Sequence, residues 1–142
     1  YFYRAEEQLK ESAMIPYAMG LLLTILSFPK IISVVAIFTL AIGDPLSAII
    51  GIKYGKHPFL ENKSYEGSGA FLIASFLCIF LPFHFVVGLT VGKNVMFSLI
   101  WSLLITAFEA LPSRVDDNLT IPLVTATIGW IIASLWSIPL SV

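Results

Sequence analysis

The sequence predicts an all-α, polytopic membrane protein with about five transmembrane helices, and three observations support this fold class. The 142 residues are 58% hydrophobic, and their mean hydropathy is +0.92. Charged residues make up 12% of the chain, about half the share found in soluble domains. The apolar residues form continuous runs, without the alternation of a membrane β-barrel. We therefore expect a single integral membrane domain over residues 1–142.

Five apolar stretches each approach the ~20 residues that cross the hydrocarbon core of a bilayer. They cover residues 13–29, 31–52, 67–87, 95–111 and 119–140. Gly55 and Pro58 are expected to end the second stretch, and Pro82 is expected to kink or break the third. The chain opens with YFYRAEEQLKES and no initiating Met, so we expect it to lack its own N-terminus.

The charges are distributed unevenly between the two ends of the predicted bundle. With five crossings, one end, called side A below, holds the N-terminal segment and the loops 53–66 and 112–118. Six of the eight basic residues lie at side A, so the positive-inside rule assigns it to the cytoplasm. All nine acidic residues lie at side A or in spans toward it, which predicts one chemically active cytoplasmic face. The alternative is that membrane insertion alone keeps charges off the other side.

A first motif, GDPLSAIIGIKYG, covers residues 43–55 at the end of the second stretch. Asp44 lies inside the predicted span, where an ionised group costs about 3 kcal/mol or more and needs a partner, a cavity or a metal. On a helix, Ser47, Gly51 and Gly55 share one face with Asp44. Such a stripe of small residues lets a backbone or a ligand approach closely, or it simply packs two helices together.

The loop that follows, KHPFLENKSYEGS, has the parts of a phosphate site. Asn62 or Ser64 is expected to cap the next helix, and Glu66 suits its first turn. A helix N-terminus with free N–H groups, the Lys63 ammonium and the Ser64 hydroxyl can together hold a phosphate. The alternative is an ordinary capped loop with interfacial lysines, and His57 is expected at its surface.

A second motif, FEALPSRVDDNLTIP, covers residues 108–122 between the last two stretches. Glu109, Asp116, Asp117 and Asn118 offer the oxygen ligands that Mg²⁺ prefers. No cluster of Cys and His is present in the sequence, so zinc is not expected. An Asx turn that caps the fifth helix is the alternative, but it leaves Glu109 in the apolar run unexplained.

In the five-span topology both motifs converge on side A. The first motif and the loop that follows it offer a lysine, hydroxyls and helix-end amides for phosphates, and the second motif offers acids for a metal. Together they predict a site for a metal-bound polyphosphate at the cytoplasmic membrane surface, with a lipid partner that arrives from the bilayer. Phosphoryl transfer depends mainly on positioning and charge neutralisation, which these groups can supply.

At these motifs the sequence resembles the CTP-dependent lipid-alcohol kinases, which include dolichol, phytol and farnesol kinases and the yeast-type diacylglycerol kinase. Phosphatidate cytidylyltransferases are more distant relatives. The family pattern G-D-x-x-A-x-x-x-G-x-x-x-G, then K-[KS]-x-E-G-[ST], is similar to Gly43-Asp44 through Gly55 and to Lys63 through Ser68 here. Pro45 and Leu46 separate the aspartate from the small residues. Members of the family carry further spans upstream of this region.

The resemblance implies transfer of the γ-phosphate of CTP to a long-chain lipid alcohol, with Mg²⁺. It assigns the metal to Asp44, Glu109 and Asp117. It assigns catalysis to Asp44, Asp116 and Lys63, with Asp44 or Asp116 accepting the proton of the alcohol. It assigns nucleotide binding to the following residues: Ser47, Gly51, Gly55, Lys63, Ser64, Glu66, Gly67, Ser68 and Asn118.

Two other functions compete with the kinase. A phosphatidate cytidylyltransferase also uses CTP, Mg²⁺ and a lipid, but it releases pyrophosphate where a kinase releases CDP. An ion-coupled transporter would use intramembrane acids such as Asp44 and Glu109, but no inverted repeat is evident and the acids lie toward one face. A net charge of −1 gives no nucleic-acid footprint. The sequence leaves the oligomeric state and the identity of the lipid open.

Overall fold

The computed structural model is a bundle of helices with a short β-hairpin. It describes the backbone of residues 2–60, 63–111 and 117–141, and the side chains of 14–59, 63–111 and 120–141. The elements are α1 (Phe2–Ser27), α2 (Lys30–Phe38), η1 (Thr39–Gly43), α3 (Asp44–Tyr54), β1 (Pro58–Leu60), β2 (Lys63–Ser64), α4 (Tyr65–Pro82), η2 (Phe83–Val87), α5 (Val91–Ala110) and α6 (Asp117–Leu135). The symbol η marks a π-helical segment. Helical segments that follow one another without a break, such as α2, η1 and α3, are together called a rod below.

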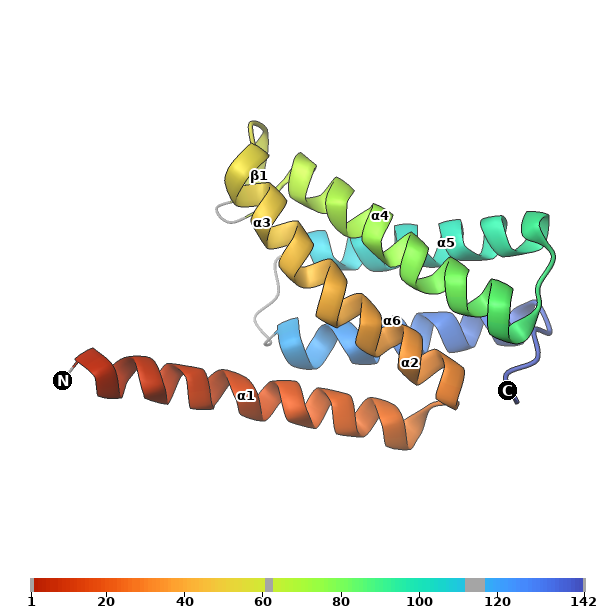
Figure 1. Ribbon diagram of the computed structural model, residues 1–142, viewed down its shortest axis with the longest axis horizontal. Helices are drawn as coiled ribbons and strands as arrows, with labels where there is room; N and C mark the ends of the chain where they lie inside the picture. The colour runs from red at the N-terminus through yellow and green to blue at the C-terminus, as the bar shows by residue number, and fades with distance from the viewer. Residues whose placement is uncertain (1, 61–62, 112–116, 142) are drawn as a thin grey trace.

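The rods run back and forth between two ends of the molecule (Figure 1). One end holds the start of α1, the hairpin, the end of α5 and the start of α6. The other end holds the turn from α1 to α2, the turn from η2 to α5, and the C-terminus. This alternation is the one that five crossings predict, and it brings the described parts of side A to one end.

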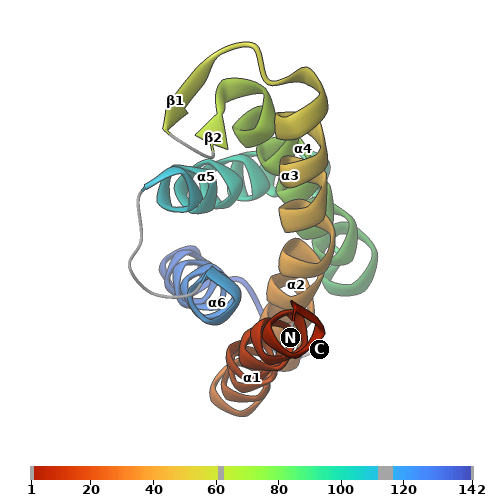
Figure 2. The ribbon, with the colours of Figure 1, turned by 90° about the vertical axis from the view of Figure 1, so that its left-hand side faces the viewer.

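Three rods in the described part of the chain are long and apolar enough to span a membrane: Lys30–Tyr54, Tyr65–Val87 and Val91–Ala110. Met14–Ser27 and Thr120–Leu135 are apolar helices of shorter length. Viewed from the side-A end, α5 and α6 lie on one side and α2 to α4 on the other, with α1 next to α2 and α6 (Figure 2). The prediction of a helical, integral membrane protein is confirmed.

The rod from α2 to α3 is continuous but contains the π-helical turn η1 directly before Asp44. Pro45 explains this turn, because its ring lacks an N–H group and would clash with the carbonyl of Ala41 in a regular α-helix. Widening the turn relieves the clash. The proline that separates the aspartate from the small residues of the first motif therefore sets the helical register at Asp44.

Of the kink or break expected at Pro82, the break does not occur. The helix continues from α4 into the π-helical segment η2 and stops at Gly88, whose φ of 78° lies in the left-handed region. The Leu89 N–H closes this end by donating to the Phe83 carbonyl at 3.2 Å. Glycine adopts such a φ without a steric penalty, so the chain can turn sharply into α5.

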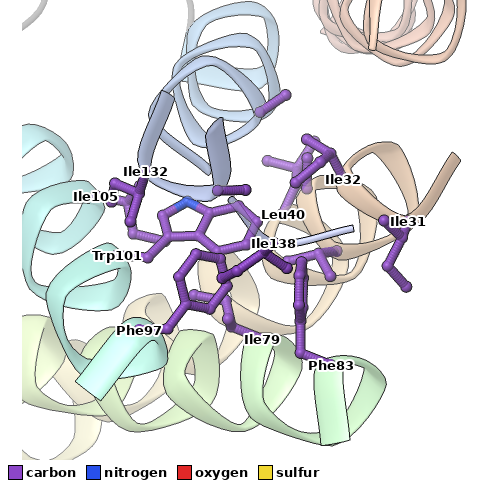
Figure 3. Packing of buried hydrophobic residues seen from close by; sticks show 14 of the residues in the cluster. Ile31, Ile32, Leu40, Ile79, Phe83, Phe97, Trp101, Ile105, Ile132 and Ile138 are labelled. Atoms are coloured by element: carbon purple, nitrogen blue, oxygen red, sulfur yellow. The ribbon is translucent and has the colours of Figure 1, made fainter. Parts of the chain in front are cut away.

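Aromatic side chains from two rods, α4–η2 and α5, form the centre of the core (Figure 3). Phe83, Phe97 and Trp101 are fully buried and lie ring against ring, with centroids 4.8 to 5.8 Å apart. The Trp101 Nε1–H donates to the Thr125 carbonyl at 2.9 Å. A Cβ at Gly129 would overlap the Trp101 ring, so the glycine lets α6 approach α5. This contact fixes the position of α5, whose last turn carries Glu109.

The hairpin is an element that the sequence analysis described only as a loop. Pro58 pairs with Ser64 and Leu60 pairs with Lys63, in antiparallel register. The helix after the hairpin begins at Tyr65, two residues before the predicted start at Gly67. Ser64 caps it, as one of the two predicted candidates, while Asn62 lies outside the described residues.

Candidate functional site

The first motif and the segment that follows it in the sequence, residues 56–68, meet where α3 packs against the start of α4. A Cβ built on Gly67 would lie 2.9 Å from the Ser47 carbonyl oxygen and 3.4 Å from the Gly51 Cα. A Cβ on Gly51 would lie 3.4 Å from the Ser64 Oγ. A Cβ on Gly55 would collide with the Gly51 carbonyl. The small-residue stripe thus brings the backbones of two helices together, with the Ser64 hydroxyl between them.

Two N–H groups at the start of α4 already have acceptors within the protein. The Gly67 N–H donates to the Ser64 Oγ at 3.2 Å, and the Tyr65 N–H donates to the His57 carbonyl at 3.2 Å. The sequence analysis expected free N–H groups at this helix start. For these two N–H groups the expectation is wrong, because each already has an acceptor. A phosphate oxygen would have to replace the Ser64 hydroxyl as acceptor, aided by the positive end of the helix macrodipole.

Glu66 in the first turn of α4 holds the beginning of the hairpin. Its Oε1 lies 2.7 Å from the Nδ1 of His57, and its Oε2 accepts from the His57 backbone N–H at 3.4 Å. His57 is largely exposed, as predicted. Glu66 therefore has a structural role, and its assignment to the nucleotide stays a prediction.

Lys63, from the loop after the first motif, contacts the second motif. Its Nζ lies 3.3 Å from the Oε1 of Glu109 and also donates to the main-chain carbonyl of Glu109. The exposed fraction of the side chain is 21% for Lys63 and 8% for Glu109. Because 46 residues separate the two, the contact exists only in the folded chain. The lysine of one predicted half-site and a glutamate of the other thus lie in one place.

The other predicted residues divide into two groups. Asp44 is partly buried at the start of α3, and Ser68 is partly buried in the first turns of α4. Asp117 and Asn118 begin α6 at the same end as the hairpin (Figure 1), but their side chains lie outside the described residues. Asp116 lies outside them altogether.

Within the described part of the chain, no three residues of the types His, Cys, Asp and Glu lie close enough together to hold a metal. Mg²⁺ needs fewer, because proteins usually hold it through one or two carboxylates together with substrate phosphates. Glu109 supplies a buried carboxylate and a main-chain carbonyl that already face a cationic group. The described residues therefore fit a Mg²⁺ ion that shares its coordination with a nucleotide.

Comparison with known proteins identifies relatives of this chain. It is 38% identical over 111 residues to a probable chloroplastic phytol kinase of Glycine max; the aligned region is 71% of this chain and 34% of that protein. It is 31% identical over 141 residues to a CTP-dependent diacylglycerol kinase of Schizosaccharomyces pombe; the aligned region is 91% of this chain and 64% of that protein. A dolichol kinase of the same yeast is 37% identical over 92 residues, or 63% of this chain and 17% of that protein.

The chain belongs to this family of lipid kinases. The resemblance found in the two motifs is thereby confirmed. No protein-family model and no solved structure matches the chain. The chain spans less than two thirds of the length of each of these lipid kinases, and about a third of the phytol kinase.

The parts of the structure that hold these contacts lie at one end of the bundle. The hairpin, the α3–α4 contact and the end of α5, whose last turn carries Glu109, gather at the side-A end (Figures 1 and 2).

Proposed function

We propose that this chain forms the catalytic part of a CTP-dependent kinase, which transfers the γ-phosphate to a long-chain lipid alcohol such as a polyprenol, phytol or diacylglycerol. The reaction takes place at the cytoplasmic membrane face. The observation that carries the proposal is the contact between Lys63 and Glu109, because it joins the phosphate-binding half of the site to the metal-binding half.

The phosphates of the donor bind at the start of α4. The close contact of Gly51 with Gly67 lets the main chain approach a phosphate, and Ser64 and Ser68 offer hydroxyl groups beside it. Lys63 adds the positive charge that balances the phosphate oxygens. Mg²⁺, when bound, further neutralises the charge that develops on the transferred group.

Asp44 is the acceptor of the alcohol proton in this proposal, with Asp116 as the alternative. Asp44 lies three residues before Ser47, which meets Gly67, so it is about 4.5 Å deeper along the helix axis than this contact. A hydroxyl that enters from the bilayer would meet Asp44 before it meets the phosphates. Holding the hydroxyl and the phosphoryl group in this order supplies the positioning that the transfer requires.

The choice of donor and of reaction draws on the relatives. The yeast diacylglycerol kinase is CTP-dependent by name, which supports CTP over ATP. The relatives named above are all kinases, which favours transfer of the γ-phosphate over the cytidylyl transfer considered from the sequence.

The proposal is tested with purified protein in mixed micelles, Mg²⁺, and CTP or ATP labelled at the γ-phosphate. A polyprenol, phytol, farnesol and diacylglycerol serve as acceptors, and the label is followed into the lipid phase. We expect labelled lipid and free CDP. Formation of pyrophosphate with an unlabelled cytidylyl lipid would support the cytidylyltransferase instead. No nucleotide turnover with any acceptor, in folded full-length protein, would contradict both.

A further inference from the structure

The ammonium of Lys63 occupies a position that is built for a cation. Two oxygens of Glu109 surround it, one from the carboxylate and one from the main chain. Glu109 lies in the last turn of α5 (Val91–Ala110), where the negative end of the helix macrodipole adds to the charge of the carboxylate. Carboxylate and carbonyl oxygens are also the ligands that hard divalent cations prefer.

This position favours a positive charge. The Glu109 side chain is 8% exposed, so water gives its carboxylate little stabilisation. A buried carboxylate at the C-terminal end of a helix is costly unless a cation accompanies it. Lys63 meets this need from a hairpin strand that is only two residues long, β2 (Lys63–Ser64), and its side chain is 21% exposed.

A divalent ion and the ammonium compete for the same oxygens. Mg²⁺ approaches its oxygen ligands to about 2.1 Å, and the Nζ of Lys63 lies 3.3 Å from the Oε1 of Glu109. Two positive groups so close to one oxygen repel each other strongly in a partly buried site. Binding of the ion at Glu109 therefore favours departure of Lys63.

We propose that Lys63 is an exchangeable substitute for the divalent cation, which neutralises Glu109 in the resting protein and moves to the donor phosphates when the ion arrives. Lys63 lies next to Ser64 at the start of α4, so rotation of its long side chain is enough to exchange one partner for the other. The competition with the ion stands independently of the proposed kinase activity, whereas the nucleotide as the new partner of Lys63 rests on it.

The exchange is tested with Mn²⁺ as the probe, because the EPR signal of free aqueous Mn²⁺ falls as the ion binds. Without nucleotide, we expect Lys63→Met to bind Mn²⁺ about tenfold more tightly than the wild type, since the competing ammonium is gone. Lys53→Met, which removes an exposed lysine in the last turn of α3, is the matched control and should bind as the wild type does. Adding Glu109→Gln to Lys63→Met should abolish the gain.

A folded Lys63→Met variant that binds Mn²⁺ no more tightly than the wild type would overturn the proposal. If this variant does not fold, the wild type supplies the answer through acetylation of its lysines, followed by mass spectrometry. Saturating Mn²⁺ should raise the acetylation rate of Lys63 several-fold and leave that of Lys53 unchanged. An unchanged rate at Lys63 would overturn the proposal equally.

CTP separates this inference from the proposed function. In the wild type, CTP should tighten Mn²⁺ binding by drawing Lys63 away, and the effect should be much smaller in Lys63→Met. If Lys63→Met binds Mn²⁺ more tightly but CTP changes nothing in either protein, the exchange stands and the nucleotide function fails. If lipid is phosphorylated while Mn²⁺ leaves Lys63 unaffected, the function stands and the exchange fails.

Discussion

At the scale of single residues, Asp44 carries the strongest expectation. The variant Asp44→Asn keeps the shape of the side chain but cannot accept a proton or balance a metal ion. We expect at least a 100-fold loss of phosphoryl transfer, the usual contribution of a general base. The measurement is label transfer from CTP to lipid, with tryptophan fluorescence and gel filtration to verify folding. Normal turnover in a folded Asp44→Asn protein would remove Asp44 from the site.

Gly67 and Gly69 form a matched pair of positions in the first turns of α4. Gly67→Ala would bring a methyl group to 2.9 Å from the Ser47 carbonyl, whereas a Cβ at Gly69 meets no atom within 4 Å. We expect Gly67→Ala to lower the free energy of unfolding by about 1–3 kcal/mol through overpacking. Gly69→Ala should be neutral or slightly stabilising, because alanine favours helix. Thermal unfolding in detergent measures both, and equal effects would contradict the close contact of α3 and α4.

Local chemistry made part of the candidate site predictable at this scale. The cap at Ser64 and the stripe of Ser47, Gly51 and Gly55 follow from spacing alone, and the structure has both. The pairing of Lys63 with Glu109 does not, because it depends on how α5 is placed 46 residues later. The contact of His57 with Glu66 was also missed, since a single exposed histidine carries no pattern.

At the scale of the helices, Pro45 connects backbone geometry to the site. Pro45→Ala restores an N–H group and removes the clash with Ala41, so the turn η1 (Thr39–Gly43) can tighten into a regular α-helix. Loss of the wide turn would rotate Asp44 relative to α2 by up to about 100°, the step of one helical residue. We expect lower turnover together with an unchanged or higher melting temperature.

The control for this variant is Pro82→Ala, which removes the proline near the far end of α4 without altering the register at Asp44. Its turnover should stay near that of the wild type. If Pro45→Ala is as active as the wild type, then the π-helical turn has no part in positioning Asp44.

Most of the rods were predictable because they depend on composition. Apolar runs gave the three long spans to within a few residues at each end, for example 31–52 against Lys30–Tyr54. The two π-helical turns and the hairpin were not predicted. The first π-helical turn accommodates Pro45 inside a packed rod, and the second lies directly after Pro82. The hairpin is a strand pairing of only five residues. Hydrophobic periodicity reports none of these features.

At the scale of the whole molecule, the hairpin end is expected in the cytoplasm. Cys78 is the single cysteine of the sequence, so Cys78→Ser provides a background without thiols. In this background, Lys56→Cys near the hairpin and Lys93→Cys at the start of α5 place thiols at exposed positions of opposite ends. A membrane-impermeant maleimide should label Lys56→Cys only from the cytoplasmic side and Lys93→Cys only from the other side. Labelling in the reverse sense would invert the topology.

The one-sided distribution of polar groups along the bundle has a consequence for membrane composition. A neutral alcohol can move between leaflets, but a phosphorylated one carries charges that the hydrocarbon interior opposes strongly. With the hairpin, the α3–α4 contact and Glu109 all at one end, the proposed reaction would release every product molecule into the same monolayer. Such a protein would deplete a freely exchanging lipid alcohol from both leaflets and accumulate its phosphorylated form in only one of them.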